Sequence, residues 1–371
     1  MIQTQQWYHW LLGIGWVASL GLQGWMNTDE ATFRERQEQA LQALAAKPPG
    51  SIAYEYEKNS YPRAIARFLQ GDAAAIAFLE QPDPEAVQTQ QVDLHSGFTL
   101  KVQMRKYFAL PLTSQHRAQM RQAFAQVTRQ DPLTVTANPP RKFWQNSQDD
   151  CTTLVDCRGT ENLQTMVETS VYLMAEETGN EGVQALYAQK LRDRVERLTR
   201  YGFAEWNSPS YLGHTTAAWL NLYDYAQDPE IKALAQQALD RCFEMAALKY
   251  WRGTWGHPAK RYAGEGAARF FWLYFGEARL PAQPEPDWVH ASLSTYRPQL
   301  RTLQIARRQF TKPWQVQRFH ANYPRTQIGF QETIYFGSNY EIAFLDRQSG
   351  PDWTSFGLRW WDGQQIRQFY Y

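Results

Sequence analysis

The strongest constraint on the fold is a series of helices with short connections in the middle of the chain. Apolar residues recur at helical spacing over residues 163–177, 183–198 and 231–246. Ser208-Pro209 and Asp228-Pro229 predict two helix starts, because each places an N-cap residue before a Pro. Short connections make consecutive helices antiparallel neighbours, so this region predicts an array of helical hairpins.

The flanking regions are less regular. Residues 31–46 and 62–80 predict further helices, whereas residues 98–110 alternate at first and predict one or two strands. Beyond Pro286, short aromatic and β-branched segments predict strands at 300–306, 333–335, 342–345 and 355–361. The predicted domains are therefore a signal-like or anchor segment (1–26), an α-helical domain (27–285) and an antiparallel β region (286–371).

Composition narrows the class of protein. Lys and Arg number 38 against 37 Asp and Glu, so the net charge of +1 argues against nucleic acid as a partner. Aromatic residues make up 15 % of the 371 residues, and this content is typical of a folded chain with a large core rather than a disordered one.

The N-terminal segment and the cysteines bear on localisation. Residues 10–22 carry no charge and fit the apolar part of a secretory signal, with an uncleaved membrane anchor or a buried first helix as alternatives. We therefore expect a periplasmic or secreted protein, with membrane attachment through this segment left open. In an exported protein Cys151 and Cys157 could close a short loop, while Cys242 lies on an apolar helix stripe. No Cys and His residues have metal-ligand spacing, and we expect no metal or cofactor.

Three polar and aromatic clusters lie at predicted helix starts or in loops between helices: residues 158–162, 205–214 and 250–262. In the second cluster Asn207, Tyr211 and His214 follow i, i+4 and i+7 spacing and can share one helix face. Each cluster also has a structural interpretation. The first is consistent with helix capping, and the tryptophans of the third with a packed aromatic corner.

These residues together suggest a family. RGTEN at 158–162, WNSPSYLGHT at 206–215, LNLYDYAQDPEIKALAQQALD at 220–240, RGTWG at 252–256 and YFGSNYEIAF at 335–344 resemble segments of bacterial proteins related to alginate lyases and heparinases. The resemblance covers roughly residues 140–371. It implies a mainly α fold, with an (α/α) toroid of antiparallel helical hairpins followed by a smaller antiparallel β-sheet region, and a polysaccharide or oligosaccharide partner. A second chain could complete the β region.

The resemblance also implies a chemistry, β-elimination from a uronic acid in an acidic polysaccharide. By position, Asn162, with Glu161 as a second candidate, would neutralise the substrate carboxylate. His214 would be the base and Tyr211 the acid, and Arg261 or Arg252 would stabilise the phenolate. The expected substrate-binding residues are Glu161, Trp206, Asn207, Trp251, Arg252, Trp255, His257 and Tyr262, with Tyr262 as an alternative phenol. Leu163 follows Asn162 where lyases of this kind often have a second His.

Two other functions remain open. A glycoside hydrolase would use a pair of carboxyl groups, for which the candidates are Asp150, Asp156, Glu161 and Glu205. A non-catalytic glycan-binding or scaffold protein would keep Trp206, Trp251 and Trp255 as stacking surfaces and would need no acid or base. Among enzymes, the lyase is favoured over the hydrolase.

Overall fold

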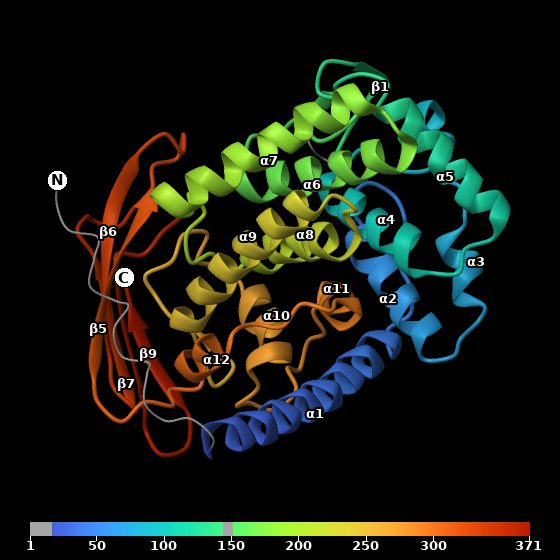
Figure 1. Cartoon of the computed structure of the whole chain (residues 1–371). Coiled ribbons are helices and arrows are strands. Elements are labelled where there is room, and N and C mark those ends of the chain that lie inside the picture. Colours follow the sequence, from blue (N-terminus) through green and yellow to red (C-terminus); the bar gives the residue numbers. More distant parts are fainter. Residues whose placement is uncertain (1–16, 144–150) are drawn as a thin grey trace.

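The structure is a computed structural model that describes residues 17–143 and 151–371. It is mainly α-helical and ends in a separate antiparallel sheet, as the sequence predicted (Figure 1). The sheet stands at one end of the helical part, next to α7, α9 and α12. Helices α2, α3 and α5 lie at the opposite end.

Three helical hairpins form the middle of the molecule. They are α4 (Gly97–Ala109) with α5 (Ser114–Val127), α6 (Glu161–Thr178) with α7 (Glu181–Tyr201), and α8 (Leu212–Tyr225) with α9 (Pro229–Lys249). The first helix of each hairpin is buried over most of its length, and α5 and α7 bury one face only. Helix α6 packs against α4 and α8 as well as against its own partner α7. The predicted helices of this region are confirmed.

The segment predicted as one or two strands, 98–110, is instead helix α4. All of its residues from Gly97 to Tyr107 are buried. The helix therefore lacks an exposed polar face, and its sequence does not show the apolar residues at helical spacing that would have identified it. Two of the buried cationic side chains on this helix bind distant partners. Arg105 binds Asp224 at 2.9 Å, and Lys106 donates to the carbonyl oxygen of Leu79 at 2.9 Å.

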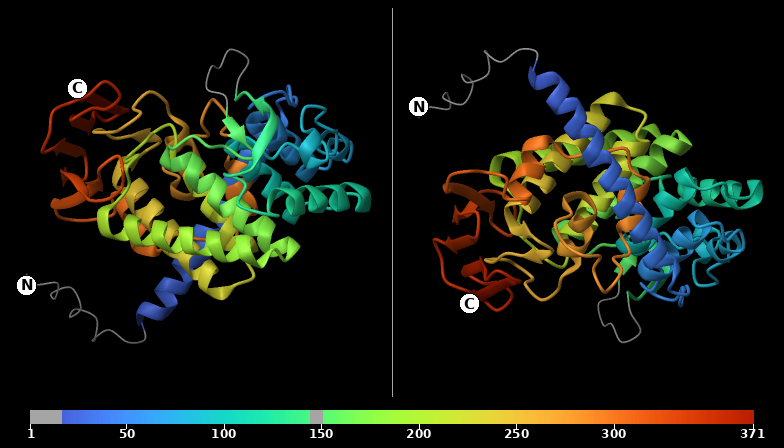
Figure 2. Two further views of the ribbon diagram at one scale, coloured as in Figure 1. Left: turned by 90° about the horizontal axis from the view of Figure 1, so that it is seen from above. Right: turned by 90° about the horizontal axis from the view of Figure 1, so that it is seen from below.

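The N-terminal helices are α1 (Val17–Ala45), α2 (Glu57–Leu69) and α3 (Ala75–Leu79), followed by the short 3₁₀ helix η1 (Val87–Thr89). Helix α1 runs along one side of the helical part, beside α10 and α11 (Figures 1 and 2). Arg36 fixes this position, because it donates to the carbonyl oxygens of Leu273 and Tyr274 at the end of α10. None of the helices among the described residues is long and apolar enough to cross a membrane. Residues 1–16, with most of the predicted leader, lie outside the described residues.

After α9 the chain forms a small hairpin, β3 (Tyr250–Trp251) and β4 (Thr254–Trp255), and then α10 (Gly266–Phe275), α11 (Trp288–Leu293) and α12 (Leu300–Ala306). The strand predicted at 300–306 is therefore wrong. Thr302, Leu303 and Ala306 bury one face of α12, and α12 packs against α9. A run of seven residues is too short for its apolar spacing to separate a helix from a strand.

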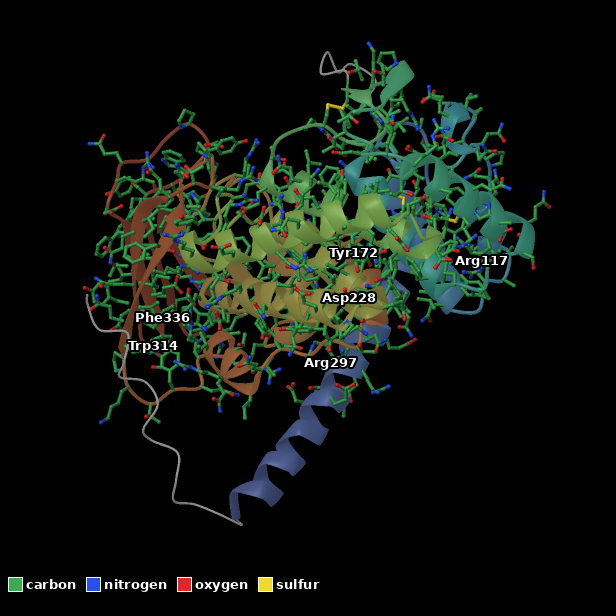
Figure 3. The ribbon with its side chains drawn as sticks, turned by 45° about the horizontal axis from the view of Figure 1, so that its top comes forward. Arg117, Tyr172, Asp228, Arg297, Trp314 and Phe336 are labelled. Carbon is green, nitrogen blue, oxygen red and sulfur yellow. A yellow bond between two sulfur atoms is a disulfide. The ribbon has the colours of Figure 1, made fainter. Side chains whose placement is uncertain are left out.

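Among the described residues the C-terminal sheet has the order β5-β6-β7-β8-β9 and is antiparallel throughout. Its strands are Trp314–Ala321, Ile328–Phe336, Tyr340–Leu345, Phe356–Trp361 and Ile366–Tyr370, which confirms the strands predicted in the last 40 residues. Trp314 and Phe336 stack 4.8 Å apart on the inner face (Figure 3). The outer face exposes Phe319, Tyr335, Trp360 and Phe369.

A second small sheet joins β1 (Thr136–Arg141) to β2 (Cys151–Thr153). Cys151, the first residue of β2, forms a disulfide with Cys157, a pair that the sequence allowed for an exported chain. Cys242 is a buried free thiol, as expected from its position on the apolar stripe of α9.

Candidate functional site

The starts of the three buried helices α4, α6 and α8 meet on one side of the molecule. Phe98 from α4, Leu163 and Met166 from α6, and Ala218 from α8 form one apolar cluster, against which Tyr211 packs. Polar side chains of the first helical turns therefore lie around this apolar cluster. We call Phe98, Asn162, Tyr211, His214 and Asp287 the rim site.

His214 is held by a buried carboxylate. Its Nδ1 lies 2.5 Å from Oδ2 of Asp287, which directly precedes α11, and its ring meets Phe98 edge-on at 4.9 Å. The other carboxylate oxygen of Asp287 accepts a hydrogen bond from Lys101 of α4. The His214 side chain keeps 20 % of its surface exposed, whereas Asp287 and Lys101 are buried.

The protonation states follow from these contacts. Burial alone would raise the pKa of Asp287, but Lys101 and His214 lower it far below its usual value, so the group is a carboxylate. An ionised carboxylate only accepts hydrogen bonds, so Nδ1 of His214 is the donor. Burial lowers the pKa of His214, partly opposed by Asp287. The imidazole is therefore neutral at pH 7 and carries its lone pair on Nε2.

Tyr211 and Arg261 lie next to this pair. The rings of Tyr211 and His214 are 6.4 Å apart, and the Arg261 guanidinium is 5.7 Å from the Tyr211 ring. Tyr211 is half-buried, and the Arg261 side chain is 40 % exposed, with a loose ion pair to Asp352 at 3.8 Å. The structure thus brings together Tyr211, His214 and Arg261, three of the four predicted catalytic residues.

Asn162, the fourth, occupies the first turn of α6 beside Glu161 and Glu205. The backbone N–H of Asn162 donates to the Glu205 carboxyl at 2.8 Å, and its side-chain oxygen accepts from Thr160 at 2.7 Å. Glu161 in turn accepts from the backbone N–H groups of Ala204 and Glu205. Burial, and then the charge of Glu161, raise the pKa of Glu205 to about 7.

The sequence did not identify Asp287, Lys101 or Phe98 as parts of the site. Asp287 lies 73 residues after His214, in a Pro-rich boundary with no motif of its own. Lys101 and Phe98 lie in the segment that was predicted as strand. One signal was present for Lys101, since a lysine within an apolar helix needs a buried acidic partner.

Trp206 and Asn207 point away from the rim site and into the junction between helices and sheet. Asn207, at φ +52°, donates to Glu332 at 3.1 Å and to the carbonyl oxygen of Pro258 at 2.9 Å, and it accepts from Arg318. Glu332 also binds Lys249 at 2.5 Å and His320 at 2.9 Å. We call Asn207, Lys249, Arg318, His320 and Glu332 the junction network.

The three tryptophans predicted to stack on sugars are buried. Trp206, Trp251 and Trp255 are 1 %, 2 % and 6 % exposed. Trp206 packs edge-on against Phe330 at 5.0 Å, and the Trp255 indole N–H donates to the carbonyl oxygen of Asn207 at 2.7 Å. A sugar ring needs an open aromatic face, so this packing contradicts the stacking role and supports the alternative of an aromatic corner.

The remaining predicted binding residues lie near the sheet. His257 is buried and stacks on Tyr370 at 3.7 Å, and burial, together with Lys249 and Arg359, lowers its pKa to about 3. Arg252 lies over the Trp361 ring at 4.1 Å, away from the rim site. Tyr262 directly follows Arg261 and is exposed, with its ring 6.4 Å from Tyr370.

The helix start predicted at Ser208-Pro209 is displaced. Helix α8 begins at Leu212, and the Ser208 hydroxyl accepts from the backbone N–H of Tyr211 at 3.1 Å in the turn that precedes it. This turn separates the residues that face the junction from those that face the rim.

Comparisons of the chain with protein-family models, with curated proteins and with solved structures found no match. Any assignment of function therefore rests on the residues and their geometry.

Proposed function

We propose that this protein is a carbohydrate-active enzyme, a polysaccharide lyase that cleaves an acidic polysaccharide by β-elimination at the rim site. We further propose that its helical hairpins belong to an (α/α) toroid, with the substrate crossing the side on which α4, α6 and α8 begin. The observation that carries the proposal is the hydrogen bond between Nδ1 of the partly exposed His214 and the buried Asp287 carboxylate, because it leaves Nε2 available as a base.

A general base must be unprotonated and fixed in direction. Asp287 orients the imidazole and would stabilise the imidazolium that forms when Nε2 takes the proton from the carbon next to the uronate carboxylate. Lys101 keeps Asp287 ionised, so the proton stays on His214 rather than passing to Asp287. In this scheme Asp287 and Lys101 are positioning residues, and His214 is the catalytic base.

The acid of the reaction is Tyr211. Its hydroxyl would protonate the glycosidic oxygen that leaves, and the neighbouring Arg261 would stabilise the phenolate that results. Tyr262 remains the alternative phenol, because it adjoins Arg261 in the chain.

The substrate carboxylate needs a hydrogen-bond donor whose interaction with it becomes stronger as the neighbouring carbon loses its proton. Asn162 is the proposed donor, with Arg261 nearby. The N-termini of α4, α6 and α8 also face this side, and the positive ends of the helix dipoles favour an anionic group there. Leu163, where lyases of this kind often carry His, belongs to the apolar cluster. A second imidazole, His290, lies 3.8 Å from Asp287 but is fully buried, so the partly exposed His214 is proposed as the base.

The contacts of the acidic residues favour a lyase over a hydrolase. Glu161 accepts a hydrogen bond from the backbone N–H of Glu205, and Glu205 accepts one from the backbone N–H of Asn162. Both carboxyl groups are therefore engaged with backbone N–H groups, whereas a hydrolase would place them on either side of the glycosidic bond. Asp156 is buried against Arg158. Asp150 lies outside the described residues.

We also propose that the protein works in the periplasm or is secreted. The Cys151–Cys157 disulfide supports this location, because such bonds persist mainly in oxidising compartments.

The test is incubation with a panel of uronate polysaccharides, followed by the ultraviolet absorbance of unsaturated sugar ends. We expect absorbance to rise with the wild-type protein and to fall by about 10²–10⁴-fold with His214→Ala and with Tyr211→Phe. Tyr335→Phe is the matched control, because it also removes a tyrosine hydroxyl, but from the exposed outer face of the sheet.

Reducing ends that appear without this absorbance would instead support a hydrolase. Binding on a glycan array without turnover of any bound glycan would support the non-catalytic alternative.

A further inference from the structure

Away from the rim site, three carboxylates are buried together. Glu57 begins α2, Asp83 lies between α3 and η1, and Asp93 precedes α4. One oxygen from each lies within 4.8 Å of the other two, and Glu57 is 0 % exposed. We call these residues the carboxylate cluster.

The hydrogen bonds of the cluster leave part of it unsatisfied. Glu57 Oε2 accepts from the Thr99 hydroxyl at 3.1 Å, but Oε1 of the same carboxylate is buried without a hydrogen-bond partner. Gln103 is fixed nearby, because its amide N–H donates to the carbonyl oxygen of Asp93 at 3.0 Å, and its side-chain oxygen is also buried without a donor. Buried oxygens without donors are costly, and a cation is one group that satisfies several at once.

The charges of the cluster do not balance. Arg141 binds Asp93 at 2.6 Å and Asp83 at 2.9 Å, which sets one positive charge against three carboxylates. Lys106 is the next cation, but its ammonium group donates to the carbonyl oxygen of Leu79 and lies beside His116, and burial lowers its pKa to about 7. The three carboxylates and Arg141 together carry a net charge of −2 when all are ionised.

We propose that the carboxylate cluster binds one divalent cation, Ca²⁺. The donors are oxygens, which hard cations prefer, and the −2 charge matches a divalent ion. Ca²⁺ fits better than Mg²⁺, because Mg²⁺ usually keeps several waters, whereas Ca²⁺ accepts protein oxygens in flexible numbers. The spacing of Glu57, Asp83 and Asp93 in the sequence gives no metal motif, which is why no metal was expected.

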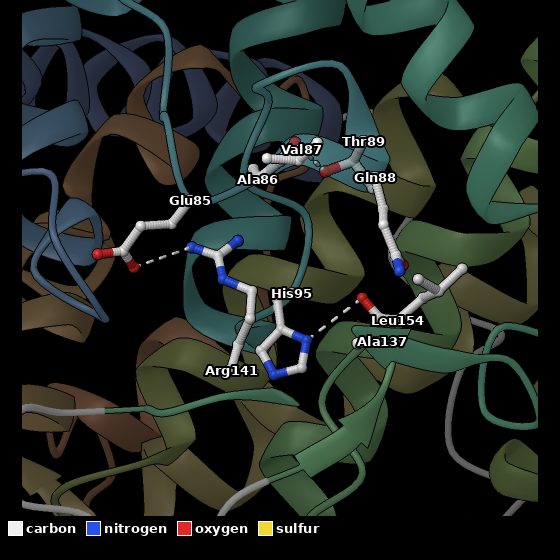
Figure 4. Close-up of a pocket in the computed structure, with 9 residues that line it drawn as sticks. All are labelled: Glu85, Ala86, Val87, Gln88, Thr89, His95, Ala137, Arg141 and Leu154. Carbon is white, nitrogen blue, oxygen red and sulfur yellow. Dashed lines mark hydrogen bonds and ion pairs between the residues drawn. The ribbon is translucent and has the colours of Figure 1, made fainter. Parts of the chain in front are cut away.

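A small cavity of about 30 Å³ adjoins the cluster through Arg141, which binds Asp83 and Asp93. Arg141 and His95 line it, and the exposed Glu85 lies 4.0 Å from the Arg141 guanidinium at its edge (Figure 4). The Ca²⁺ ion would connect the start of α2 to the loops before η1 and α4. Phe98, in the first turn of the same helix α4, contacts the His214 ring edge-on. We therefore expect the bound ion to reduce the mobility of this part of the rim site.

The test is equilibrium dialysis of the full chain with Ca²⁺ after EDTA treatment. We expect one Ca²⁺ per chain and a rise in Tm as Ca²⁺ is added, since a ligand that binds only the folded state stabilises it. Glu57→Gln keeps the shape of the side chain and removes its charge. It should fold, weaken binding by about a hundredfold and abolish the rise in Tm.

Glu85→Gln is the matched control, because it removes a charge that contacts the same arginine from outside the cluster. It should bind Ca²⁺ like the wild-type chain. Failure of the wild-type chain to bind Ca²⁺ would overturn the proposal and indicate that Glu57 holds a proton instead. Equal binding by Glu57→Gln and the wild-type chain would overturn it as well. Lyase activity enters none of these measurements, so this result is independent of the proposed function.

Discussion

One stretch of ten residues, 205–214, supplies Tyr211 and His214 to the rim site and Asn207 to the junction network, and yet these residues differ in their burial. In the junction network Asn207, Lys249 and Glu332 are buried and satisfy one another. At the rim, His214 and Tyr211 keep part of their surface exposed. Such a difference indicates stabilisation of the fold in the first case and availability for a ligand in the second. Substitutions should therefore affect stability in one cluster and activity in the other.

The largest effect is expected for Lys249→Met. Lys249 and Glu332 are fully buried, so loss of the ammonium group leaves part of a buried carboxylate unpaired and lowers the free energy of unfolding by about 3–5 kcal/mol. Urea denaturation followed by tryptophan fluorescence measures this. Lys190→Met, which breaks a partly exposed pair with Asp131, should cost less than about 1 kcal/mol. Similar losses in both variants would contradict the importance of the junction network.

The pH dependence of stability tests Glu205, whose buried carboxyl accepts a hydrogen bond from the backbone N–H of Asn162 in the rim site. Its pKa is about 7 in the folded protein against 4.5 for an unperturbed Glu, because burial and Glu161 disfavour the ionised form. The folded state therefore keeps a proton that the unfolded state loses between these values. The free energy of unfolding should fall by about 3 kcal/mol as the pH rises from 4.5 to 7.

Glu205→Gln should remove that part of the pH dependence, measured by urea denaturation at several pH values. A variant whose stability follows pH as steeply as the wild-type protein would show that Glu205 is not the titrating group.

Asn207→Ala should lower the free energy of unfolding by about 2–3 kcal/mol. It removes hydrogen bonds to charged groups and places a side chain with Cβ at φ +52° without the local hydrogen bonding of Asn. Asn207→Gly removes the same hydrogen bonds, but glycine adopts a positive φ without strain. It should therefore lower the free energy of unfolding by about 1 kcal/mol less than Asn207→Ala. Thermal or urea denaturation of both variants distinguishes the two contributions, and equal losses would show that backbone conformation does not matter here.

The smallest effect on stability is expected for Tyr211→Phe, within about 0.5 kcal/mol, because the half-buried ring keeps its apolar contacts. The same variant should lose lyase activity. If it unfolded as readily as Asn207→Ala, the contrast between the two clusters would fail.

The sequence was sufficient to predict most of the helices and the late strands. Helical spacing over α6, α7 and α9, the Asp228 N-cap with Pro229, and the short aromatic and β-branched C-terminal segments are local signals, and the structure follows them. Helix α4 was mistaken for strand because it is buried all round, and α12 because it is short. In both, the periodicity that distinguishes a helix from a strand is missing or incomplete.

For the site, the sequence showed three polar and aromatic clusters at helix starts and in loops, and the resemblance that they carry selected Tyr211, His214, Asn162 and Arg261. Only the tertiary structure decided which side of the Ser208-Pro209 turn each residue faces, and it directed Trp206 and Asn207 to the sheet. It also supplied Asp287 and Lys101 to His214, and it brought Glu57, Asp83 and Asp93 together. Such pairings depend on the packing of helices far apart in the chain. Local spacing carries no information about them.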